Sequence, residues 1–133
     1  MRVLIADDDY GFRTFMRRVL DKEANLSVVG EAMDGEEAVR KAKELMPALV
    51  LMDLDMPRTD GLEATRRLKV SLPGTVVIMF SMFDGREYRD AAARSGADGF
   101  LVKTTAISQI LATIRHWLPG KPPTNKSLVK GQS

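Results

Sequence analysis

The residues best placed to do chemistry are acidic side chains that directly follow buried strands. Asp7 and Asp8 come straight after the apolar run at residues 3–6, and Asp53 lies near the end of the apolar run at residues 48–54. Neighbouring carboxylates repel one another and resist leaving water, and a bound divalent cation is the usual reason for such a cluster. We therefore expect a metal site at the carboxyl ends of these strands.

The types of ligand available limit the choice of metal. The chain has no cysteine and one histidine, His116, which is remote in sequence and falls within an expected helix. We interpret His116 as a surface or half-buried helix residue without a ligand role. A set of carboxylates alone favours a hard cation such as Mg²⁺, with Mn²⁺ as a substitute.

Two further polar residues fall at equivalent strand ends. Ser81 closes the fourth apolar run and Lys103 closes the fifth. Taken singly, Ser81 would be read as a turn residue and Lys103 as a surface cation. Because they occur together at successive strand ends, we expect a hydroxyl and an ammonium group that face the carboxylates and complete an anion-handling site.

The elements that position these residues alternate along the whole chain. Apolar strands are predicted at residues 3–6, 26–32, 48–54, 75–80 and 98–102. The first helix is marked by a stripe of Phe12, Phe15, Met16, Val19 and Leu20, and later helices are expected near residues 35–46, 61–71, 86–94 and 105–118. Strands without polar alternation, separated by single helices, predict an α/β fold with a doubly wound, five-stranded parallel sheet.

Local signals place several helix boundaries. Asp34 and Glu37 have the spacing of a capping box, and Asp9 suits the positive dipole end of the first helix. In the last helix we expect the aliphatic side chains to face inward, namely Ile107, Ile110, Leu111 and Ile114.

Composition places the chain among ordinary globular domains. It has 133 residues, 44% of them hydrophobic, and a net charge of +2. The last fifteen residues hold three lysines and no acid, which leaves 17 basic and 18 acidic residues in 1–118. This balance argues against nucleic-acid binding by the segment itself. We expect no signal peptide and no membrane span, and therefore a cytoplasmic protein.

In its motifs the chain resembles the receiver domain of two-component response regulators. The matching segments are residues 6–9, Asp53 with residues 56–61, Ser81, and residues 96–100 leading to Lys103. They extend in the right order from residue 2 to about residue 118. The resemblance implies a flavodoxin-like fold with strand order 2-1-3-4-5 and five helices, and a signalling module rather than an enzyme.

The resemblance also implies roles for the acidic residues. Asp53 would accept a phosphoryl group from a phosphohistidine on a sensor kinase or a phosphotransfer protein. Mg²⁺ would be held by Asp7, Asp8 and Asp53, together with the backbone carbonyl of Asp55. Such a transfer depends mainly on positioning and charge neutralisation.

Other implied roles concern the response to phosphorylation. Ser81 and Lys103 would bind phosphoryl oxygens, and Phe100 corresponds to the aromatic residue that switches position. The fourth helix, fifth strand and fifth helix would form the output face, and phosphorylation could promote a homodimer.

The sequence departs from the usual receiver pattern near the site. Thr104 follows Lys103 where proline is common, a variant similar to receivers attached to helix-turn-helix outputs. The bulky Met82 and Phe83 follow Ser81 and would lie at the rim of the site. They either pack under the next loop or restrict water and prolong the life of the aspartyl phosphate.

Two questions on organisation stay open at this stage. Residues 1–118 are expected to form the receiver, and residues 119–133 a flexible tail or the start of a linker to a transcriptional output. A stand-alone receiver that signals by protein contact is the alternative. The Asp53-Leu54-Asp55 sequence also resembles the nucleophile motif of haloacid dehalogenase-like phosphatases, although those carry the motif on the first strand.

Overall fold

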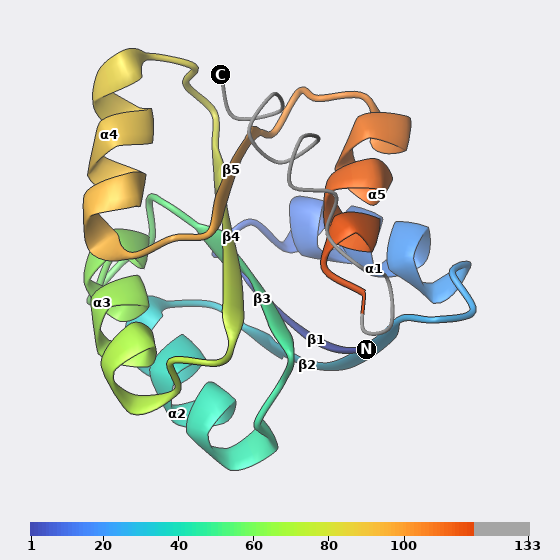
Figure 1. Ribbon diagram of the computed structural model, residues 1–133, viewed down its shortest axis with the longest axis horizontal. Coiled ribbons are helices and arrows are strands. Elements are labelled where there is room, and N and C mark those ends of the chain that lie inside the picture. Colours follow the sequence, from blue (N-terminus) through green and yellow to red (C-terminus); the bar gives the residue numbers. More distant parts are fainter. Residues whose placement is uncertain (119–133) are drawn as a thin grey trace.

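A single parallel sheet organises the computed structural model, which describes residues 1–118 (Figure 1). Its five strands lie in the order β2-β1-β3-β4-β5. The strands are β1 (Arg2–Ala6), β2 (Ser27–Ala32), β3 (Leu49–Asp53), β4 (Val76–Ser81) and β5 (Gly99–Val102). The helices are α1 (Tyr10–Asp21), α2 (Gly35–Leu45), α3 (Gly61–Ser71), α4 (Arg86–Ser95) and α5 (Ile107–His116). The predicted fold class and strand order are confirmed.

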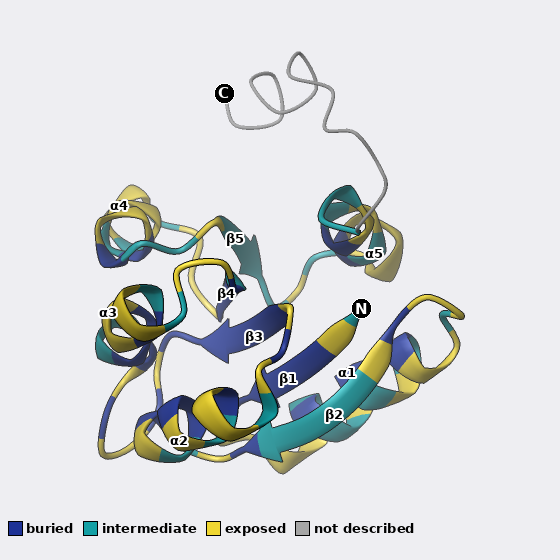
Figure 2. Ribbon diagram, turned by 60° about the horizontal axis from the view of Figure 1, so that its bottom comes forward, coloured by how far each residue is buried: buried dark blue, intermediate teal, exposed yellow. Residues whose placement is uncertain are grey.

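Helices cover both faces of the sheet. One core cluster joins the sheet to α2, α3 and α4, and a second joins its other face to α1 and α5. Every residue of β3 is buried, whereas the edge strands β2 and β5 are mostly half-buried (Figure 2). Burial on both faces explains why the central strands read as unbroken apolar runs.

The predicted inner faces of two helices are partly wrong. In α1, Phe15 is 42% exposed, and a charged residue, Arg13, is buried instead. In α5, Ile107 is 43% exposed because it opens the helix, whereas Ile110 and Ile114 are buried as predicted. Helical periodicity identifies a face but does not say how far the sheet extends beneath it.

Aspartates begin three of the helices. Asp9, Asp34 and Asp60 are the N-caps of α1, α2 and α3, and each carboxylate accepts a backbone N–H of the first turn. The expected capping box at α2 is modified, because Glu37 accepts the N–H of Met33, one residue before the cap.

The tail predicted at residues 119–133 lies outside the described residues. Within residues 1–118, no helix is long and apolar enough to cross a membrane.

Candidate functional site

Adjacent parallel strands bring the acidic residues together. The register pairs Val3 with Leu49 and Ala6 with Met52, so β1 and β3 end side by side. The strand order reverses between these two strands, and such a point commonly forms a ligand site. Acidic residues from distant parts of the sequence therefore lie together at the carboxyl ends of β1 and β3.

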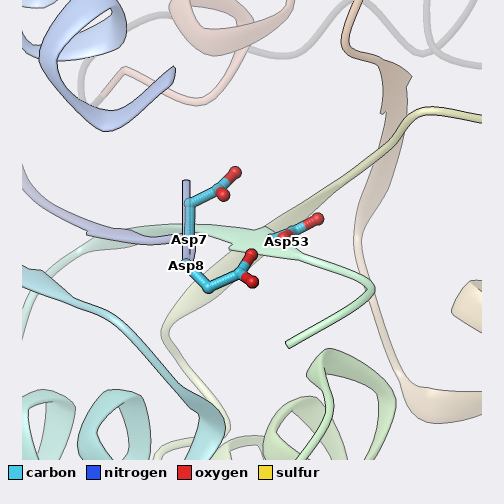
Figure 3. A group of neighbouring side chains, drawn as sticks. All are labelled: Asp7, Asp8 and Asp53. Carbon is cyan, nitrogen blue, oxygen red and sulfur yellow. The ribbon is translucent and has the colours of Figure 1, made fainter. Parts of the chain in front are cut away.

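Three carboxylates form the centre of the site at these strand ends. Asp7, Asp8 and Asp53 each offer an oxygen, and these oxygens lie within 4.8 Å of one another (Figure 3). Asp7 and Asp53 are buried, whereas Asp8 is exposed. The group therefore has two buried carboxylates and one that faces solvent.

Lys103 supplies the positive charge opposite the acids. Its Nζ lies 2.7 Å from Asp7 Oδ2 and 3.4 Å from Asp53 Oδ1. The same ammonium group lies 4.7 Å from the centre of the Phe12 ring, which packs edge-on against Phe80. The backbone N–H of Lys103 donates to the carbonyl oxygen of Ser81 at 2.8 Å, which ties the ends of β4 and β5 together.

Burial and charge alter the ionisation of the site. Burial and the neighbouring Asp7 charge raise the pKa of Asp53 to about 8, although Lys103 opposes the shift. Burial lowers the pKa of Lys103, but the ion pairs with Asp7 and Asp53 outweigh it and the net pKa is raised. The positive charge of Lys103 therefore does not fully offset the effect of burial and of the Asp7 charge on the pKa of Asp53.

The donor set fits a hard divalent cation. All three side chains present carboxylate oxygens, the ligands that Mg²⁺ prefers. Asp7 Oδ2 is buried without an aligned hydrogen bond, because it meets Lys103 only as an ion pair. Asp55, predicted to contribute a backbone carbonyl, is exposed in the loop that follows β3.

The loop after β4 carries the predicted hydroxyl and rim residues. Ser81 is buried, and its Oγ accepts the N–H of Phe83 at 3.0 Å. Met82 and Phe83 are 59% and 54% exposed. The Phe83 ring stacks on Tyr88 of α4 with 5.3 Å between centroids, so Phe83 packs along the following helix.

Phe100 lies on the edge strand β5. The strand β4 separates β5 from β3, which carries Asp53. Phe100 is half-buried against the core beneath α2, α3 and α4, and its strand partner is Met79. The guanidinium of Arg89 lies 4.9 Å from the ring centre and also donates to Asp84 at 2.6 Å. A side chain of α4 therefore covers the aromatic residue and contacts the loop that follows Ser81.

Glycines allow a close approach at the back of the site. A Cβ on Gly61 would lie 2.0 Å from the backbone oxygen of Asp53, and one on Gly35 would lie 1.7 Å from the oxygen of Thr59. Thr59 is buried and donates its hydroxyl to Glu36. The loop between β3 and α3 is thus pressed against both the Asp53 backbone and the start of α2.

Sequence reasoning missed two residues that support the site. Phe12 was assigned only to an apolar stripe, yet its ring contacts Lys103. Arg13 was not singled out, yet its guanidinium donates to the carbonyl oxygen of Asp7 at 2.7 Å. The sequence signal for Arg13 was its helical spacing, which places it on the inner face of α1 with Met16 and Leu20.

Comparison with known proteins identifies the class. The family model described as the response regulator receiver domain matches residues 3–115. The chain therefore belongs to the receiver domain family of response regulators, a family of signalling modules that bind Mg²⁺ in an acidic pocket and work with histidine kinases or phosphotransfer proteins.

Curated relatives are longer proteins. The uncharacterized transcriptional regulatory protein YxjL of Bacillus subtilis is 36% identical over 86% of this chain and 53% of its own length. The response regulator VraR of Staphylococcus saprophyticus is 40% identical over 86% of this chain and 55% of its own length. The chain thus spans about half the length of the curated relatives it matches.

Solved structures agree with the fold and family. The receiver domain of the response regulator NarL from Mycobacterium tuberculosis is 31% identical, with a TM-score of 0.84, over 90% of this chain and 97% of that chain. A chain of the CheX–CheY–BeF3–Mg²⁺ complex from Borrelia burgdorferi is 27% identical, with a TM-score of 0.81, over 86% of each chain.

Proposed function

We propose that this chain is a phosphorylation-activated switch whose phosphoryl acceptor is Asp53. The donor is a phosphohistidine on a sensor histidine kinase or a phosphotransfer protein. The observation that carries the proposal is the shared position of Asp53, Asp7 and Asp8, with Lys103 opposite them. No other described group of three or more potential metal ligands meets the same distance limits.

Asp53 acts as the nucleophile. A carboxylate oxygen forms a bond to phosphorus while the phosphorus–nitrogen bond to histidine breaks, and the imidazole nitrogen keeps the electron pair. Asp7, Asp8, Asp53 and the Asp55 carbonyl would hold Mg²⁺, which would offset the repulsion between the acid and the phosphoryl oxygens. Lys103 adds a second positive charge and pairs with one of these oxygens.

The switch follows from the new charge on Asp53. An acyl phosphate carries a charge of about −1.5 to −2 at the end of β3. Ser81 donates its hydroxyl proton to a phosphoryl oxygen, and Lys103 follows another, so the ends of β4 and β5 shift. Phe100 then turns inward and alters the face formed by α4, β5 and α5.

The output that we propose is control of transcription by a longer protein. Support comes from the relatives. One of them is a transcriptional regulatory protein, and the match with this chain spans 53% of that relative's length. A regulator from Aurantimonas assigned to the LuxR family is 27% identical with a TM-score of 0.84. In this proposal the described domain receives the signal and a further domain acts on DNA.

Intact-mass measurement tests the chemistry. The protein is incubated with acetyl phosphate and MgCl₂, and we expect a gain of one phosphoryl group. Asp53→Asn should abolish the gain and EDTA should suppress it, whereas Asp84→Asn, a change at an exposed acid outside the site, should retain it. Absence of any gain, with acetyl phosphate and also with a phosphohistidine donor, would overturn the proposal.

A further inference from the structure

Arg13 is a buried charged residue that the proposed phosphotransfer does not use. It is 6% exposed and lies on the inner face of α1. Its Nη1 donates to the backbone oxygen of Asp7 at 2.7 Å, and its Nε donates to Glu31 Oε1 at 3.0 Å. A buried guanidinium with two directed hydrogen bonds has a defined orientation, unlike a lysine on a flexible stem.

Glu31 on β2 anchors this arginine from the far side. Its other carboxylate oxygen accepts Arg17 Nη1 at 2.7 Å, so one acid binds two arginines of α1. Tyr10 adds a further contact, with its ring centre 5.5 Å from the Arg13 guanidinium. Only Arg13 of these two arginines reaches the strand end that carries the acids.

The contact with Asp7 falls on the peptide that leads to Asp8. The N–H of Asp7 donates to the carbonyl oxygen of Ala32 at 2.9 Å, and Asp7 Oδ1 accepts the N–H of Asp9 at 2.8 Å. The carbonyl of Asp7 belongs to the peptide plane that continues into Asp8. Arg13 therefore holds the oxygen of the peptide that precedes the exposed Asp8.

We propose that Arg13 is a positioning residue for the Mg²⁺ site. It does not contact the ion; it orients the Asp7–Asp8 peptide so that the Asp8 carboxylate joins those of Asp7 and Asp53. This inference rests on the proposed function, because it assumes that these acids bind Mg²⁺. Groups that orient metal ligands from outside the coordination shell commonly change metal affinity by about 10–100-fold.

Two simpler roles for Arg13 make different predictions. If the guanidinium served only as a nearby positive charge, its removal would strengthen the binding of a divalent cation. If Arg13 served only to attach α1 to the sheet, its removal would lower the unfolding temperature and leave the affinity of the folded protein unchanged. Positioning alone predicts that the folded variant binds Mg²⁺ more weakly despite the loss of a positive charge.

The test is calorimetric titration of MgCl₂ into the full 133-residue chain. We expect Arg13→Met to weaken Mg²⁺ binding about tenfold. Arg17→Met is the matched control, because it removes the other arginine from Glu31 without touching Asp7, and its affinity should match that of the wild type. Arg13→Lys keeps the charge but loses the two-point geometry, and should fall between the wild type and Arg13→Met.

The outcomes separate the inference from the proposed function. Equal or tighter binding by folded Arg13→Met overturns the positioning role while the wild-type site stands. Should Arg13→Met fail to fold, wild-type affinity in Arg13→Lys overturns it by the same rule. A wild-type chain that does not bind Mg²⁺, or whose binding survives Asp53→Asn and Asp8→Asn, overturns the proposed site and the inference with it.

Discussion

At the scale of single residues, Asp53 combines properties that oppose one another. It is buried among acids, which favours its neutral form, yet a nucleophile toward phosphorus must be ionised. Lys103 reduces the conflict but does not remove it, because Asp7 shares the same ammonium group. A bound cation would therefore both ionise Asp53 and stabilise the fold.

The raised pKa of Asp53 has a signed effect on stability. Without metal, the free energy of unfolding should fall as the pH rises from about 4 to about 8. The folded state keeps a proton that the unfolded chain, with an ordinary pKa of 3.8, has released, so higher pH favours unfolding. The effect should be on the order of 1 kcal/mol or more. Urea unfolding in EDTA across this range measures it.

The control for this prediction is Asp53→Asn, which removes the carboxyl group of residue 53 and leaves Asp7 and Asp8 in place. Its stability should depend less on pH over the same window. Parallel pH profiles for the wild type and Asp53→Asn would contradict the assignment of the effect to Asp53.

Met82 provides a prediction about the lifetime of the phosphate. It directly follows Ser81 and is 59% exposed, so a smaller residue would open the rim to water. We expect Met82→Ala to shorten the life of the aspartyl phosphate about two- to fivefold, an effect of less than 1 kcal/mol on the barrier. Phosphate release after removal of the donor gives the rate. Met33→Ala, at another exposed methionine, should leave the rate unchanged.

At the scale of elements, the loop between β3 and α3 depends on backbone contact. Arg58 in this loop has a φ of 66°, in the left-handed region, and pairs with the N-cap Asp34 at 3.4 Å. Gly61 meets the Asp53 backbone, and Gly35 meets Thr59. The position of the acceptor is thus coupled to the start of α2 as well as to its own strand.

Gly61→Ala should therefore be costly for both stability and the site. A Cβ 2.0 Å from the Asp53 oxygen forces the backbone apart, and we expect a loss of about 2–4 kcal/mol in unfolding free energy. Gly74→Ala is the control, because nothing lies within 4 Å of its Cβ position, and it should be nearly neutral. Urea midpoints of the two variants make the comparison; similar losses in both would refute it.

The elements show how far sequence reasoning could reach. The strand and helix order followed from apolar runs and from helix breakers such as Pro47, because both are local properties of the chain. The convergence of Asp7 and Asp53 required only parallel neighbouring strands. The burial of Arg13 was signalled only by its place on the inner face of α1, because the groups that accept its hydrogen bonds, the Asp7 carbonyl and Glu31, lie in other parts of the chain.

At the scale of the whole molecule, the C-terminal limit of the folded unit is testable. The family match ends at residue 115, but Trp117 and Leu118 pack against the core cluster beneath α1 and α5. We expect a chain of residues 1–118 to keep the full-length stability. A chain of residues 1–115 should lose about 1–3 kcal/mol as this apolar surface is exposed. Thermal unfolding of the two chains measures the difference in stability. Equal stability would contradict the packing of Trp117 against the core as a source of stability.

The contrast between β3 and β5 also has a consequence for isotope exchange. β3 is buried throughout and flanked by strands on both sides, whereas β5 is a half-exposed edge of four residues. Deuterium from solvent should reach the amides of β5 and α4 through partial openings, and those of β3 only through opening of the whole domain. Within residues 1–118, the amides of β3, which bears the acceptor, should then be among the slowest to exchange, and those of β5, which bears Phe100, among the fastest.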